Sequence, residues 1–107
     1  MKFDINEVLA DMAAAIKGEV KDNWPEVKSV ANQFLQNRKE RLALLADLRI
    51  SGEINEEKFE SRLSDEKLVA EAELHSIAVI SKAIAQNAAN AAIKILGKAV
   101  KTAIGII

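Results

Sequence analysis

The chain has 107 residues, a formal net charge of -1 and no cysteine. Its length corresponds to one domain, residues 1–107, and the lack of cysteine excludes disulfide bonds and thiolate chemistry. Half of the residues are hydrophobic but only 4% are aromatic, and this composition favours long helices. The nearly balanced charge argues against nucleic acid as a partner.

The N-terminal half carries two helical patterns separated by a proline. Asp4 is a suitable N-cap, and Glu7 follows three residues later as in a capping box. Apolar residues recur at helical spacing until Trp24 and Pro25, where the helix is disfavoured, and the spacing then resumes. We therefore expect an N-terminal arm over about residues 4–50, which either kinks or reverses direction at this proline.

A tight turn is predicted directly after this arm. Gly52 suits the left-handed position that follows a helix C-terminus, and Asn55 is a good N-cap for the next helix. Ile54 and Phe59 have the spacing of a hydrophobic staple, in which a residue before the N-cap packs on the first turn. The sequence therefore predicts two helices joined at this point.

The C-terminal arm, about residues 55–106, has no proline and no glycine before Gly97. Its apolar residues follow a helical period, so we expect one continuous helix of about 75 Å. The N-terminal arm would lie antiparallel along it, which makes the predicted fold an all-α helical hairpin. The alternative is a three-helix bundle, in which residues 5–21 pack antiparallel to residues 25–50.

Charge patterning specifies a register for this hairpin. No acidic residue follows Glu73 in the sequence, whereas lysines continue to occur. In an antiparallel hairpin, opposed residues have numbers that add up to about 105. Three acids then oppose three lysines: Asp4 opposes Lys101, Glu7 opposes Lys98 and Asp11 opposes Lys94. Nearer the turn, basic residues fall close to acids: Arg38, Lys39, Arg41 and Arg49 lie near Glu56, Asp65 and Glu66. Such pairs favour one register and contribute little stability.

Self-association is predicted because the C-terminal arm carries more apolar surface than one partner helix covers. Uncovered apolar stripes usually mark an interface, and a homodimer or higher oligomer would close a helical bundle. The predicted interface residues are Leu74, Ile77, Ile84, Ala88, Ala91, Ile95, Ala99 and Ile106.

The sequence offers no convincing catalytic or metal site. His75 is the only histidine, and Glu71 precedes it by four residues, which does not fit the Glu-x-x-His spacing of carboxylate-bridged metal sites. No glycine-rich phosphate loop or nucleophile elbow is present. We therefore expect a protein that is not an enzyme and that uses no cofactor and no metal.

We predict a structural or adaptor protein that self-associates and presents a helical surface to a protein partner. Residues 91–107 support an alternative, because they combine lysines with apolar residues and contain no acid. Cationic amphipathic helices of this kind lie on membrane surfaces, so the alternative is a membrane-active protein that uses this segment. The N-terminus lacks the apolar core of a signal peptide, and we therefore expect a cytoplasmic location.

Overall fold

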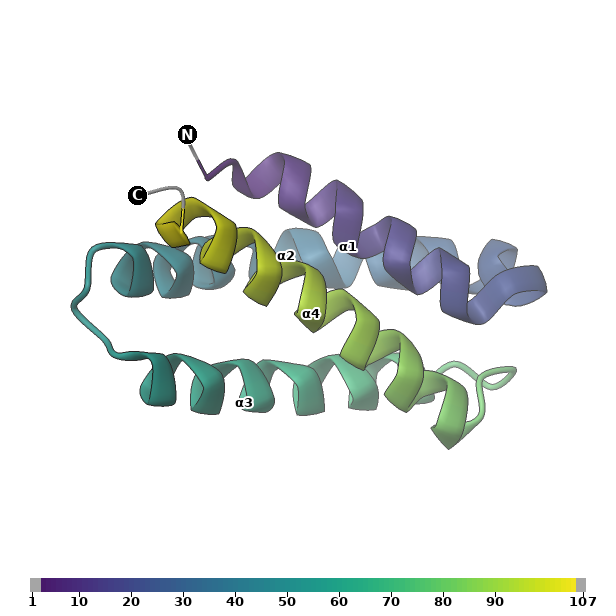
Figure 1. The fold of residues 1–107 in the computed structure, drawn as a ribbon. Coiled ribbons are helices and arrows are strands. Elements are labelled where there is room, and N and C mark those ends of the chain that lie inside the picture. The colour runs from purple at the N-terminus through teal and green to yellow at the C-terminus, as the bar shows by residue number, and fades with distance from the viewer. Residues whose placement is uncertain (1–2, 106–107) are drawn as a thin grey trace.

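A computed structural model describes residues 3–105 (Figure 1). It contains four α-helices and one short 3-10 helix: α1 (Ile5–Val20), η1 (Lys21–Asn23), α2 (Trp24–Ile50), α3 (Glu56–His75) and α4 (Lys82–Gly105). Each α-helix runs opposite to the one before it, and the described residues contain no strand (Figure 1). The predicted all-α class is therefore confirmed, and its arrangement is an antiparallel four-helix bundle.

Helix α1 begins where the sequence predicted. One carboxylate oxygen of Asp4 accepts hydrogen bonds from the backbone N–H groups of Asn6, at 2.9 Å, and Glu7, at 3.4 Å. These bonds satisfy two of the N–H groups that lack partners within the first helical turn.

The predicted turn between α2 and α3 is also confirmed. Gly52 has a φ of 84°, a left-handed conformation in which a side chain would be strained. The Asn55 side chain accepts a hydrogen bond of 2.8 Å from the backbone N–H of Lys58 and so caps α3. Phe59 is buried and Ile54 packs against the core, as a hydrophobic staple requires.

The predicted N-terminal arm over residues 4–50 is wrong as a single kinked rod. The chain reverses direction at η1, so that α1 packs against α2 (Figure 1). Lys21 leaves the helical conformation with a φ of 52°, and Pro25 then occupies the first turn of α2, where its missing N–H costs nothing. This reversal is the one that the three-helix alternative contained.

The predicted continuous helix over residues 55–106 is also wrong. It is interrupted by the loop of residues 76–81, after which α4 returns along α3 (Figure 1). The molecule therefore measures 42 × 23 × 20 Å along its principal axes, far shorter than the expected rod.

The interruption has local causes that involve neither proline nor glycine. The Ser76 hydroxyl donates a hydrogen bond to the carbonyl oxygen of Glu73, and the Ser81 hydroxyl accepts one of 3.2 Å from the backbone N–H of Ile84. Serine side chains that bond to nearby backbone groups favour helix ends. Ile80, within this loop, is buried at 3% exposure and anchors the loop in the core.

The core is centred on the contact between α1 and α4. Helix α4 contributes a row of small, fully buried residues, and α1 contributes larger ones. The residues from α4 are Ala85, Ala88, Ala89 and Ala92, and those from α1 are Val8, Leu9, Met12 and Ile16. Because alanines keep the interhelical distance short, α4 can pack against α1 and α3 at the same time.

Candidate functional site

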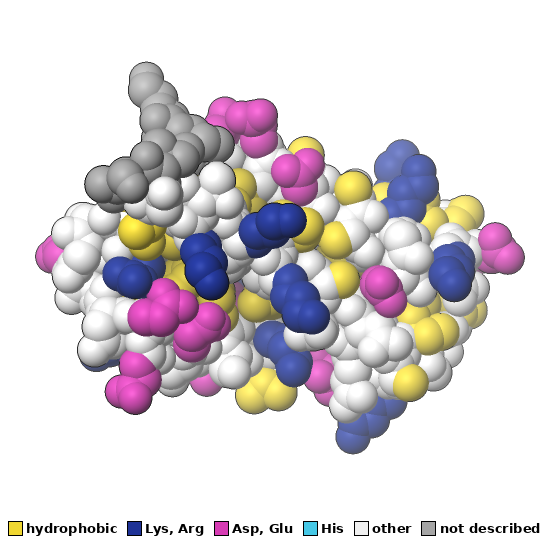
Figure 2. Space-filling model, viewed as in Figure 1, with side chains coloured by type: hydrophobic (Ala, Val, Ile, Leu, Met, Phe, Trp, Pro, Cys, Tyr) yellow, Lys and Arg dark blue, Asp and Glu magenta, His cyan; other side chains and the backbone are white. Residues whose placement is uncertain are grey.

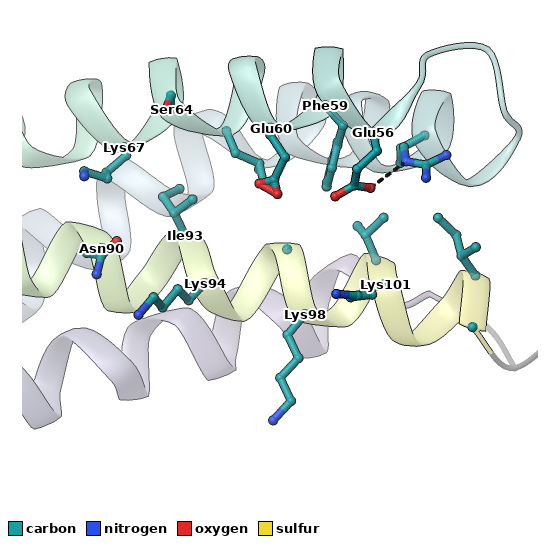
Figure 3. A pocket seen from close by; sticks show the side chains of 16 residues that line it. Glu56, Phe59, Glu60, Ser64, Lys67, Asn90, Ile93, Lys94, Lys98 and Lys101 are labelled. Carbon is teal, nitrogen blue, oxygen red and sulfur yellow. Dashed lines mark hydrogen bonds and ion pairs between the residues drawn. The ribbon is translucent and has the colours of Figure 1, made fainter.

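An open groove with a volume of about 840 Å³ lies between α3 and α4 (Figure 3). We call it the α3/α4 groove. It extends along α4 from Asn90 to Gly105 and is bordered on the other side by α3 from Glu56 to Lys67. Its position follows from the antiparallel packing of these two helices.

The floor of the α3/α4 groove is apolar. Phe59 and Leu63 from α3 meet Ile93 and Val100 from α4, and all four are buried. A methyl group at Gly97 would stand 3.3 Å from the Cδ1 atom of Leu63, which is closer than an ordinary van der Waals contact. The glycine therefore lets Leu63 lie directly against the backbone of α4.

The walls of the α3/α4 groove are charged. Five basic and two acidic residues line it: Arg49, Lys67, Lys94, Lys98 and Lys101, with Glu56 and Glu60. Figure 2 shows basic side chains across the middle of this face, with acidic side chains to either side. The groove thus has an excess of three positive charges, although the whole chain has a net charge of -1.

A second hollow, of about 360 Å³, lies on the other side of α4, between α4 and α1. Three acids of the predicted register, Asp4, Glu7 and Asp11, line this hollow together with Lys98. Lys94 and Lys101 instead line the α3/α4 groove. Within residues 3–105 no ion pair shorter than 4.0 Å joins α1 to α4, so any attraction acts over a longer distance.

We expect the interaction between Glu7 and Lys98 to be favourable but small. In a double-mutant cycle with Lys98→Glu and Glu7→Lys, the coupling free energy should be below about 1 kcal/mol, because both side chains are exposed. It should decrease further at high ionic strength. Thermal unfolding of the four proteins at two salt concentrations measures it, and a coupling of zero at low salt would contradict the predicted register.

The residues predicted as an interface lie at different depths. Leu74 and Ala88 are buried within the chain, and Ile106 lies outside the described residues. The remaining residues are partly exposed: Ile77, Ile84, Ala91, Ile95 and Ala99. In this bundle α1 and α3 cover much of the apolar stripe for which a second copy was expected.

One buried carboxylate joins α2 to α3. The Arg38 guanidinium donates two hydrogen bonds of 2.8 Å from Nη2 to the two carboxylate oxygens of Glu66, and Arg41 donates one of 3.0 Å from Nε. The Glu66 side chain is 6% exposed, Arg38 is 25% exposed and Arg41 is 66% exposed. Arg49 also pairs with Glu56, at 3.1 Å. The charge pattern predicted these neighbours.

We expect Arg38→Met to lower the free energy of unfolding by about 1–3 kcal/mol, because buried Glu66 loses its bidentate partner. Arg41→Met should lower the free energy of unfolding by less, since Arg41 is largely solvated and Arg38 would still neutralise the Glu66 carboxylate. The double variant Arg38→Met, Glu66→Met should be more stable than Arg38→Met alone. Urea unfolding measures the free energy of unfolding of the three variants. If Arg38→Met and Arg41→Met lower it equally, this assignment of partners is refuted.

The candidates for a metal site are His75 and the acidic residues. His75 is exposed at the end of α3, and no group of three or more histidine, cysteine, aspartate or glutamate residues is placed to hold a metal ion within the described chain. Across the same residues, no helix is both long enough and apolar enough to cross a membrane.

The sequence did not predict the α3/α4 groove, because the two helices that form it were expected to be one. Gly97 was the visible signal, since a glycine within a helical pattern often permits a close approach. Comparisons with protein-family models, curated proteins and solved structures found no match to this chain. The described residues define a four-helix bundle with a long, charged groove between α3 and α4.

Proposed function

We propose that this protein is a non-enzymatic adaptor that holds one helix of a protein partner in the α3/α4 groove. The observation that carries the proposal is the groove itself, which combines an apolar floor with charged walls over a long, open path. Amphipathic helices bind in grooves of this kind, with their apolar face on the floor and their polar face towards water.

The dimensions of the groove suit a helix better than a small molecule. The stretch of α4 from Asn90 to Gly105 spans about 22 Å, or roughly four helical turns. Sites for small molecules instead enclose most of the surface of their ligand. An open path of several turns offers several anchor positions to a helix and little enclosure to a metabolite.

Site-specific photo-crosslinking tests this proposal directly. Two exposed serines on α3 provide a matched pair, since Ser64 lines the groove and Ser61 does not. A photoreactive residue at position 64 should give one discrete protein adduct in cells that make this protein, and the same residue at position 61 should give none. Peptide mapping of the adduct should locate the contact in a helical segment of the partner.

Two crosslinking results would overturn the proposal. Equal adduct yields at both positions indicate collisions without a specific site, and the absence of adducts at position 64 removes the partner. A circular dichroism melt of each labelled protein shows that both remain folded, so that a negative result is not caused by unfolding.

Self-association is a second proposal and rests on different residues. Leu44 on α2 and Leu68 on α3 are 58% and 62% exposed, and contact with a second copy would remove this apolar surface from water. We expect a dimer or higher oligomer at micromolar concentration, weakened by Leu44→Ser and Leu68→Ser together. Light scattering measures this, and a mass of 11.7 kDa over a hundredfold dilution range would exclude self-association.

The membrane-active alternative has less support. The apolar residues of α4 that would face lipid are buried in the bundle, among them Ala92, Leu96 and Val100. Lipid contact through that face would require α4 to leave α1 and α3, with loss of the core between them.

A further inference from the structure

We infer that the helix held in the α3/α4 groove is acidic, with carboxylates placed to reach Lys67 and Lys94. This inference rests on the proposed function and specifies the chemistry of the partner. It also identifies the end of the groove at which the partner's acids are most favourable.

The first observation is the charge of the groove. Of its two acids, Glu56 is already paired with Arg49, at 3.1 Å. Glu60 is the other acid of the groove, which four lysines also line, and within residues 3–105 none of these lysines has an ion pair of 4.0 Å or less. A partner with carboxylates would therefore meet positive charge along most of the groove, and a basic partner would be repelled.

The second observation is that the charge is uneven along the groove. Figure 3 places Glu56 and Lys101 towards one end and Lys67, Lys94 and Asn90 towards the other. The lining residues at the second end include two lysines, one from each wall, and no acid. That end is consequently the most favourable position for the partner's carboxylates.

A second copy of the chain fits this description poorly. Helix α3 is its most acidic helix but forms one wall of the groove itself. The other acidic amphipathic helix is α1, on which Glu7 and Asp11 are exposed. The apolar face of α1 is already occupied, since Leu9 and Met12 are buried against the core. Binding of α1 in the groove of another copy would therefore require the bundle to open, and a separate protein is the better occupant.

Synthetic peptides test the inference on the intact protein. The probe is a fluorescent helical peptide of about 16 residues, enough for four turns, with a leucine stripe flanked by glutamates. Two comparison peptides have lysine in place of every glutamate or the same composition in scrambled order. At physiological salt we expect the acidic peptide to bind about tenfold more tightly than the lysine peptide, a preference that high salt reduces.

Matched charge reversals on the protein separate the groove from general electrostatics. Lys67→Glu with Lys94→Glu changes two lysines in the groove, whereas Lys17→Glu with Lys82→Glu makes the same change at exposed positions outside it. The groove variant should lose about tenfold in affinity for the acidic peptide and gain affinity for the lysine peptide. The control variant should retain its affinity within about twofold.

Each other outcome overturns the inference in a recognisable way. An equal loss of peptide affinity in both variants assigns the effect to net charge. If neither peptide binds, the acidic helix is removed as occupant.

A preference for the lysine peptide would refute the acidic partner. If Ser64→Trp in the groove then weakens the binding of that peptide and Ser61→Trp outside it does not, the proposed function still stands. If the intact protein sediments with phosphatidylglycerol vesicles and the groove variant does not, lipid is the occupant. Dissociation of a dimer by the same variant would make a second copy the occupant.

Discussion

Replacing Leu96 by alanine is expected to lower the free energy of unfolding by about 2–5 kcal/mol. Leu96 is 0% exposed and lies on α4 between residues that line the α1 side and residues that line the α3 side. Truncating this side chain would leave a cavity at the point where three helices meet. The surrounding helices can close such a cavity only partly, because their other contacts hold them in place.

The matched control for this prediction is Ile95→Ala, on the same helix one residue earlier. Ile95 is only partly buried, so its truncation removes fewer contacts and leaves a site that water can enter. Thermal unfolding measures both, and each 1 kcal/mol lost should lower Tm by about 4–8 °C in a domain of this size. Losses of equal size for the two variants would contradict the burial of α4 between α1 and α3.

The fold was predictable at the level of the helical class, two helix starts and one turn. Capping residues such as Asp4 and Asn55 signal helix starts locally, and Gly52 signals the turn through its left-handed conformation. Each helix cap and the turn depend on a few adjacent residues. Their local hydrogen bonds form in the same way whatever the tertiary arrangement. This explains why they were predicted correctly although the topology was not.

Folding the hairpin in half keeps α1 beside α4 and α2 beside α3, as the predicted register assumed. Both arms reverse near their middle, one at η1 and the other at residues 76–81. Arg49 pairs with Glu56, and Glu7 lines the same hollow as Lys98. The remaining pairs of the register stay predictions. Folding in half adds contacts of α1 with α2 and of α3 with α4, which a straight hairpin lacks.

The break in the second arm was the feature that the sequence did not reveal. Its residues have no proline or glycine, and the β-branched Ile77, Val79 and Ile80 are tolerated in many helices. Besides the local bonds of Ser76 and Ser81, the reversal gives α4 contacts with α3 that a straight arm lacks. The α3/α4 groove exists only after this reversal, so its residues could not be grouped from helical spacing alone.

The arrangement of charge around α4 links the fold to the proposed binding function. Acids of α1 flank one side of its lysines, and Glu56 and Glu60 of α3 flank part of the other. These acids moderate the repulsion among lysines without pairing directly with them, so the lysines stay accessible. A helix that is buried on one side and exposes unpaired cations on the other suits recognition of an acidic partner.

Cutting the chain after Asn90 is expected to abolish cooperative unfolding of what remains. The deletion removes Ile93, Leu96 and Val100, which are all buried, together with the surface on which α1 packs. Each of these side chains contributes about 1.5–3 kcal/mol through burial. Their combined loss is comparable to the whole stability of a domain, about 5–15 kcal/mol. Circular dichroism melts and hydrogen exchange of the truncated chain measure the effect.

The same truncation separates the adaptor from the membrane-active protein. If the segment acts on lipid, the truncated chain should stay folded with an unchanged Tm, and only sedimentation with anionic vesicles should be lost. A full-length control with Lys94, Lys98 and Lys101 changed to glutamine keeps the buried apolar face and removes the cationic one. Because these lysines lie outside the core, we expect this control to remain folded and the intact protein to ignore vesicles at physiological salt. Vesicle binding that is lost in both variants, with the truncated chain still folded, would establish the membrane role instead.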